Sequence, residues 1–177
     1  MIIWDTETTG LLGPSALPIS EQPYLTEIAL MRVDAGLNEV ERFHTLIRPP
    51  ISIPDVTIKI NGIDDAMVAK SPSFARIYAT LANFFLGEEV MVAHNLPFDR
   101  GMLATELQRL DRLLQFPWPS SHLCTAEESE SIEGKYLKQQ YLYELATGKP
   151  ANQTHRAMGD VEQLLVVIRY LRKLGLM

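Results

Sequence analysis

The order of the strand-like and helical segments constrains the fold of this chain more than any other feature. Three apolar segments rich in β-branched and aromatic residues come first, at 1–5, 24–33 and 39–47. A turn-rich cluster that includes Gly36 and Asn38 separates the last two, which predicts a β-hairpin. Helical segments that alternate with strand-like ones follow. This order predicts a mixed sheet covered by helices, so the fold class is α/β or α+β.

Helical periodicity begins only after residue 70. Ser71 and Pro72 have the residue types of an N-cap and a first helical position, apolar residues then recur with helical spacing, and Gly87 can end the helix. Residues 11–23 contain one Gly and three Pro and predict a loop, whereas the pattern over 57–63 assigns no element. The other expected elements are a strand over 89–93, a helix over 97–114, a short segment over 123–132, and helices near 137–146 and 155–174.

Composition indicates a single globular domain over residues 1–177. The chain is long enough for a sizeable core, and its 46% hydrophobic and 21% charged residues are typical of globular proteins. No apolar run approaches the roughly 18 residues of a membrane span, and the first five residues lack a signal-peptide pattern. A single cysteine, Cys124, excludes an intrachain disulfide, so we expect a reducing, cytoplasmic environment.

The net charge of −6 argues against a general polyanion-binding surface. It does not exclude nucleic acid as a substrate, because carboxylates that hold divalent cations present a locally positive site once the cations are bound. The chemistry of the candidate site must therefore decide which ligand the chain takes.

The first candidate site is the pair Asp5 and Glu7, which stand two residues apart at the end of a predicted strand. Side chains with this spacing point from the same face of a strand, so both carboxylates could bind one cation. Burying two like charges is costly unless a hard cation with oxygen ligands neutralises them. Taken alone, an Asp-x-Glu pattern is more often a pair of solvated acids at a strand edge.

Two further clusters each have an ordinary structural explanation. Asp99 follows a buried strand and begins a helix, where an acid can simply cap the helix and complement its dipole. His155 and Asp160 are five residues apart, a spacing that does not place both on one helical face, so His155 is expected just before the final helix. Alone, they would be a surface His and a surface Asp.

Together, the clusters resemble one family. The segments 5–10 (Asp-Thr-Glu-Thr-Thr-Gly), 26–29 (Thr-Glu-Ile-Ala), 92–95 (Val-Ala-His-Asn) and the motif at His155 occur in the order found in the DnaQ-like DEDDh exonucleases. Residues 137–148 resemble the exonuclease X and proofreading-subunit branches of that family. The sister subgroup has a Tyr where this chain has Arg156, so the histidine subgroup is indicated.

The resemblance implies a ribonuclease H-like fold with a mixed five-stranded sheet whose first three strands are antiparallel. It also implies two divalent cations, Mg²⁺ or Mn²⁺. Asp5, Glu7 and Asp160 would hold the first cation, Asp5 would bridge to the second, and Asp99 would act largely through bound water. His155 would be the general base that takes a proton from the attacking water, a role suited to an imidazole because its ordinary pKa is about 6.5.

The resemblance also implies substrate contacts. The backbone from Thr6 to Thr8 would hold the 3′-hydroxyl, Leu11 would act as a hydrophobic wedge, and Phe98 would stack on a base.

A polar pair in the family corresponds to His94 and Asn95, which could orient Asp99 or the terminal nucleotide. The alternative for His94 is a buried histidine with its hydrogen bonds satisfied. Asn61 stands where relatives often have a His near the scissile nucleotide, and it can donate a hydrogen bond but carries no positive charge.

The resulting hypothesis is a 3′–5′ exonuclease that releases 5′-mononucleotides from single-stranded or frayed DNA. One alternative is an exoribonuclease that trims short RNA 3′ ends, because a metal site that addresses the phosphodiester does not read the 2′-hydroxyl. Another is a proofreading module bound to a DNA polymerase. A proofreading subunit would be expected to carry a partner-binding extension, but the expected elements run from Met1 nearly to Met177 and leave no obvious docking tail. An apolar face could still bind a partner, although core packing is its commoner fate: Leu113, Leu114, Phe116 and Trp118.

Overall fold

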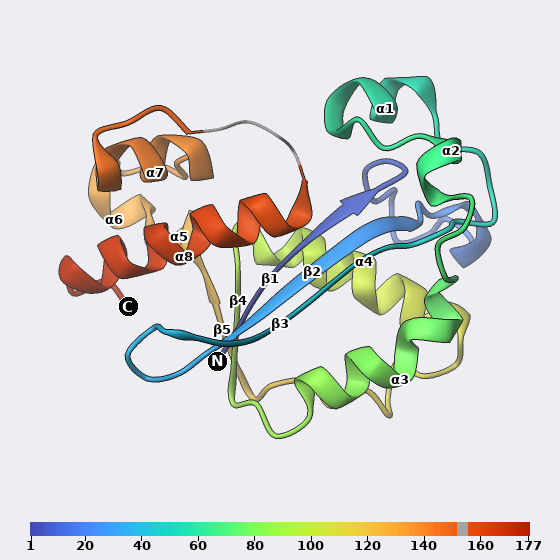
Figure 1. Cartoon of the computed structure of the whole chain (residues 1–177), viewed down its shortest axis with the longest axis horizontal. Helices are drawn as coiled ribbons and strands as arrows, with labels where there is room; N and C mark the ends of the chain where they lie inside the picture. The colour runs from blue at the N-terminus through green and yellow to red at the C-terminus, as the bar shows by residue number, and fades with distance from the viewer. Residues whose placement is uncertain (152–155) are drawn as a thin grey trace.

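The computed structural model describes residues 1–151 and 156–177, and a five-stranded sheet with helices on both faces forms its centre (Figure 1). The strands are β1 (Ile2–Thr8), β2 (Leu25–Val33), β3 (Glu39–Leu46), β4 (Val90–Ala93) and β5 (Ser121–Cys124). The helices are α1 (Asp55–Asn61), α2 (Asp65–Val68), α3 (Phe74–Phe85), α4 (Leu96–Arg109), α5 (Thr125–Glu128), α6 (Glu130–Glu133), α7 (Gln139–Thr147) and α8 (Ala157–Lys173), with a 3₁₀ turn η1 (Ile19–Glu21).

The strand order is β3-β2-β1-β4-β5, which places β1 at the centre of the sheet. β1 and β2, and β2 and β3, pair antiparallel, whereas β4 pairs parallel to both β1 and β5. The prediction of a mixed five-stranded sheet with three antiparallel strands first is therefore confirmed. Because β1 has a partner on each side, its register is fixed from both edges.

The two faces of the sheet carry separate hydrophobic clusters, since successive side chains on β1 point to opposite faces. Ile2 and Trp4 join the cluster covered by α3 and α4, and Ile3 joins the one covered by α7 and α8. Figure 1 shows α8 lying along one side of the sheet and α3 and α4 on the other. Among the residues that the structure describes, no helix has the length and apolar character needed to cross a membrane.

The apolar face considered for a partner mostly belongs to the core. Phe116 is buried, and Trp118 packs edge-on against both Phe116 and Phe85. Leu114 is 94% exposed, and a single leucine on a surface needs no partner to explain it.

Three element boundaries differ from the sequence-based expectation. The helix expected from Ser71–Pro72 begins at Phe74 with Ser73 at the N-cap, because the Pro72 carbonyl accepts a hydrogen bond from the Arg48 amide. The helix expected over 97–114 ends at Arg109, where Asp111 turns the chain into the left-handed region at φ 55°.

The third difference is the segment without an assigned element, which contains most of α1. The helix buries Thr57 and Asn61 rather than an apolar stripe, so hydrophobic periodicity could not reveal it.

Candidate metal-binding active site

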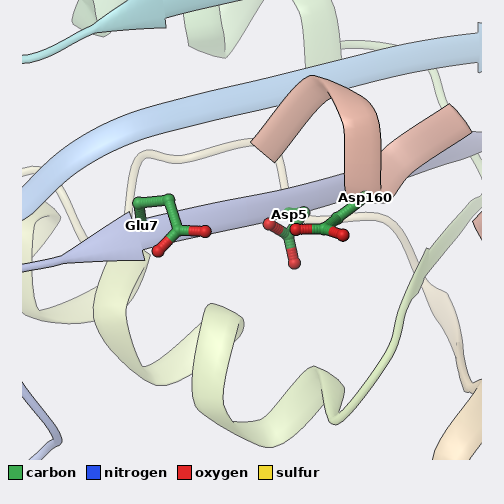
Figure 2. A group of neighbouring side chains, drawn as sticks. All are labelled: Asp5, Glu7 and Asp160. Carbon is green, nitrogen blue, oxygen red and sulfur yellow. The ribbon is translucent and has the colours of Figure 1, made fainter. Parts of the chain in front are cut away.

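Three carboxylates converge where β1 passes under the first turn of α8. Asp5 and Glu7 project from the same face of β1, and Asp160 reaches toward them from α8 (Figure 2). One carboxylate oxygen of each residue lies within 4.8 Å of the others, and all three residues are half-buried. The structure therefore brings together three of the residues that the sequence analysis selected as cation ligands.

Local sequence explains why these residues meet. The two-residue spacing of Asp5 and Glu7 puts both on the face of β1 that carries Ile3, and α8 covers this face. On α8, Ala157, Val161 and Leu164 are buried against the sheet, which turns the neighbouring Asp160 to the edge of the contact. The carboxylate cluster is therefore a polar edge of an otherwise apolar helix-on-sheet interface.

The fourth predicted acid, Asp99, holds the strand between the two acids of β1. It lies at the start of α4 and is 2% exposed, and its Oδ1 accepts hydrogen bonds from the Thr6 amide (3.0 Å) and the Thr6 hydroxyl (2.7 Å). Asp99 is outside the group of three but close enough for its charge to raise the pKa of Asp5. A role through bound water stays a prediction.

Burial and mutual repulsion make the carboxylates hard to ionise. Burial, followed by the charges of Asp99, Glu7 and Asp160, holds the pKa of Asp5 well above its ordinary value. Burial also raises the pKa of Glu7 to about 8, although a hydrogen bond from Asn61 opposes the shift, and it raises the pKa of Asp99 to about 7. Divalent cations with oxygen ligands would relieve this repulsion.

A cavity of about 230 Å³ adjoins the cluster. It is lined by Asp5, His94, Lys138, Gln139, Gln140 and Asp160. Three of these residues were not among the candidates chosen from the sequence. Lys138 immediately precedes α7, and Gln139 and Gln140 are its first two residues. Gln139 also donates a 2.8 Å hydrogen bond from Nε2 to the Asp160 carbonyl. Their signal in the sequence was the polar start of the helix expected near 137–146.

Of the predicted polar pair, His94 lines the cavity and Asn95 lies at the surface. His94 is half-buried beside the cluster, and its Nδ1 lies 3.0 Å from the Thr125 hydroxyl. Burial lowers the pKa of His94 to about 4, so the ring is neutral at neutral pH. Both interpretations of His94 therefore hold, because it has a hydrogen-bond partner and also lines the cavity. Asn95 is exposed and occupies the left-handed region at φ 60°.

The other predicted substrate contacts lie around the end of β1. Thr6 is committed to Asp99, and the Thr8 hydroxyl donates to the Gly10 carbonyl at 2.7 Å. Leu11 is 83% exposed just beyond the strand, whereas Phe98 is half-buried and packs against the core.

Asn61 reaches the site from α1 as a buried neighbour of a candidate cation ligand. Its Nδ2 donates to the Glu7 Oε2 at 3.2 Å, and its Oδ1 accepts from the Ile63 amide. This geometry holds the Glu7 carboxylate in place, so the observed contact of Asn61 is with the site itself. A direct contact with substrate stays a prediction. His155 lies outside the described residues, and its role as general base likewise stays a prediction.

The raised carboxyl pKa values predict how metal-free protein responds to pH. A carboxyl with an unfolded pKa of 4.5 and a folded pKa of about 8, as at Glu7, stabilises the fold below the lower value and loses this contribution as the pH rises through the higher one. In EDTA, the melting temperature should therefore fall by about 5 °C between pH 5 and 8.5. Glu7→Gln should flatten this dependence. A melting temperature that rises over the same range would contradict the shifts.

Known proteins resemble this chain in sequence and in fold. Residues 2–168 match the family RNase_T, described as Exonuclease. A DNA polymerase III subunit epsilon-like protein of Rhodobacter capsulatus is 31% identical over 180 residues, which are 99% of this chain and 24% of that protein. The chain thus spans about a quarter of the length of this relative.

Two solved structures have the same fold. Exonuclease X in complex with 5′ overhanging duplex DNA superposes with a TM-score of 0.67 and 26% identity, covering 98% of this chain and 92% of that one. The nuclease domain of a DEDDh family member bound to rAMP gives a TM-score of 0.75 at 15% identity, over 98% and 92% of the two chains, which is a likeness of fold alone. With its family match over residues 2–168 and its ribonuclease H-like sheet, this chain belongs to the DnaQ-like exonuclease family.

Proposed function

We propose that this chain is a 3′–5′ exonuclease that hydrolyses phosphodiester bonds at single-stranded or frayed DNA 3′ ends and releases 5′-mononucleotides. The observation that carries the proposal is the convergence of Asp5, Glu7 and Asp160 within 4.8 Å, in a member of an exonuclease family. We further propose that residues 1–177 form a single domain and, given one buried cysteine, Cys124, that it works in the cytoplasm.

The donor set suits two Mg²⁺ or Mn²⁺ ions. All ligands in the group are carboxylate oxygens, which hard divalent cations prefer, and within the described residues neither a thiol nor an imidazole belongs to the group. Cations bound there supply charge that polarises the scissile phosphate and lowers the pKa of the attacking water. In this proposal Asp5, Glu7 and Asp160 bind them directly, and Asp99 acts through water.

The residues of the chain hold these ligands in a fixed arrangement before a substrate arrives. Thr6 ties Asp99 to β1, and Asn61 donates a hydrogen bond to Oε2 of Glu7. Gln139 fixes the backbone carbonyl of Asp160 from α7. Such support limits the movement of groups that must be placed to within about 0.5 Å for catalysis. His155 would accept the proton of the attacking water, and it must be neutral to do so.

DNA is the proposed substrate because exonuclease X, 26% identical to this chain over nearly its whole length, has been solved in complex with duplex DNA. The cavity beside the cluster, which His94 lines, would accept the 3′-terminal nucleotide. Asn95 would supply a further polar contact, Phe98 would stack on a base, and Leu11 would act as the wedge. A proofreading module bound to a DNA polymerase is the second candidate, and the likeness to a polymerase III epsilon-like protein favours it.

Digestion of end-labelled oligonucleotides tests the proposal. With Mg²⁺ or Mn²⁺, 5′-labelled DNA should shorten one nucleotide at a time from its 3′ end, 3′-labelled DNA should release labelled mononucleotide at once, and EDTA should stop both reactions. RNA of the same sequence should be cut more slowly. Internal cuts, release from the 5′ end or activity in EDTA would each reject the proposal, and faster cutting of RNA would move it to the exoribonuclease alternative.

A further inference from the structure

A fifth carboxylate, Glu27, is buried beside the cluster but has a different environment. It lies on β2 directly opposite Glu7 of β1, and its exposed fraction is 0%. Arg156 binds the Glu27 carboxylate in a bidentate interaction. Its Nε lies 3.1 Å from Oε1 and 3.0 Å from Oε2, and its Nη2 lies 2.6 Å from Oε1. His44 Nε2 is 2.6 Å from Oε1. Glu27 is thus neutralised by side chains, unlike the carboxylates of the cluster.

These contacts keep Glu27 charged. Burial raises its pKa, but the hydrogen bonds from Arg156, His44 and the Ala157 amide outweigh burial, so the pKa of Glu27 lies below its ordinary value. A buried, charged carboxylate with a bidentate Arg partner forms a strong and directional contact. The Glu27–Arg156 ion pair therefore connects β2 to the residue that precedes α8.

The same carboxylate also caps α8. The helix has no capping hydrogen bond from the side chain of its own N-cap residue, Arg156. Instead, the Ala157 amide donates to Glu27 Oε2 at 3.0 Å, so a strand residue supplies the acceptor that a capping side chain normally provides. The Asp160 amide then donates to the Arg156 carbonyl at 3.0 Å, which closes the first turn. Glu27 and Arg156 thus fix the turn that carries Asp160.

We propose that Glu27 and Arg156 are positioning residues that set the place of Asp160 relative to Asp5 and Glu7, and hence the affinity of the site for divalent cations. This inference rests on the proposed function.

A matched contact at the other end of α8 separates positioning from simple anchoring. Arg169 donates from Nη2 to the Leu37 carbonyl at 2.6 Å, which ties the later turns of the helix to the β2–β3 hairpin. Both arginines fasten α8 to β2 or to the hairpin that follows it, but only Arg156 is next to the turn with Asp160. Loss of Arg169 should lower thermal stability without changing the response to cations.

The experiment measures the rise in melting temperature of EDTA-treated full-length protein as Mn²⁺ is added, together with DNA digestion. We expect Arg156→Gln to need about tenfold more Mn²⁺ for half of the maximal rise, since residues that orient ligands typically contribute 10–100-fold to metal affinity. Arg156→Lys keeps the charge but cannot make the bidentate contact. It should fold, and the Mn²⁺ concentration that it needs should lie between those of Arg156→Gln and the wild type. Arg169→Gln should keep the wild-type midpoint.

The double variant Glu27→Gln with Arg156→Gln gives the sharpest comparison. Removing Arg156 alone leaves a buried charge, whereas removing both charges should restore much of the lost melting temperature. If the pair positions Asp160, the double variant should still need more Mn²⁺. Wild-type Mn²⁺ midpoints for Arg156→Lys and for the double variant would overturn the inference while leaving the proposed function intact. A wild-type protein that neither Mn²⁺ nor Mg²⁺ stabilises, and that leaves DNA intact, would overturn the proposed function itself.

Discussion

Replacing Asp5 by asparagine should lower the kcat for digestion of DNA 3′ ends by on the order of 10³-fold or more and should at the same time stabilise the metal-free protein. Burial and the charges of Asp99, Glu7 and Asp160 already raise the pKa of Asp5. An amide of the same shape removes this repulsion but no longer offers a charged ligand. Without cations, the melting temperature at pH 8 should therefore rise by about 5 °C.

Two measurements check this expectation. Melting curves with and without Mn²⁺ should show that Asp5→Asn no longer gains stability from the cation, and oligonucleotide digestion should show the loss of activity. Asp111→Asn is the control, because it removes the same charge from an exposed turn after α4 and asparagine tolerates the φ of 55° there. An Asp5→Asn protein that still digests DNA at a rate near that of wild type would remove Asp5 from the cation site.

Replacing His155 by alanine should lower kcat about 10²–10⁴-fold while the protein keeps its stabilisation by Mn²⁺. The expectation follows from the different tasks of the two kinds of residue, since the carboxylates bind cations and the histidine would only move a proton. The rate of the wild type should rise with pH as an imidazole loses its proton, near about pH 6.5, and the variant should lose this rise. Rates measured from pH 5.5 to 9 with saturating Mn²⁺ test both points.

The control for His155 is His122→Ala, which removes an exposed imidazole from β5. It should keep both the rate and its dependence on pH. If His155→Ala is as active as this control, another group must act as the base. His94 would be an unsuitable replacement, since burial lowers its pKa to about 4 and a base that weak accepts protons poorly at neutral pH.

The sheet was predictable because its signals are local. Three strands separated by turn residues come first, and their apolar segments match β1, β2 and β3 to within a few residues. The start of α3 was not predictable in the same way, because the hydrogen bond from Arg48 to the Pro72 carbonyl joins residues far apart in the chain. The α1 helix was missed because its buried residues, Thr57 and Asn61, are polar.

The residues of the site were likewise predictable only where their signals are local. Asp5 and Glu7 share a face by strand geometry alone, and their proximity to Asp160 was expected only through a resemblance to a family. The supporting contacts could not be read from spacing, since Asn61 and Glu7 are 54 residues apart and Glu27 and Arg156 are 129 apart. Only tertiary packing creates such pairs, and a single sequence carries no record of them.

The cluster draws its ligands from both ends of the chain, and this has a consequence for biosynthesis. Asp5 and Glu7 leave the ribosome with β1, but Asp160 follows only after all five strands of the sheet have been made. A growing chain therefore holds two acids without the third, and docking of α8 completes the group only after the sheet has been made. Synthesis thus delays the assembly of a nuclease site until the protein that contains it can fold.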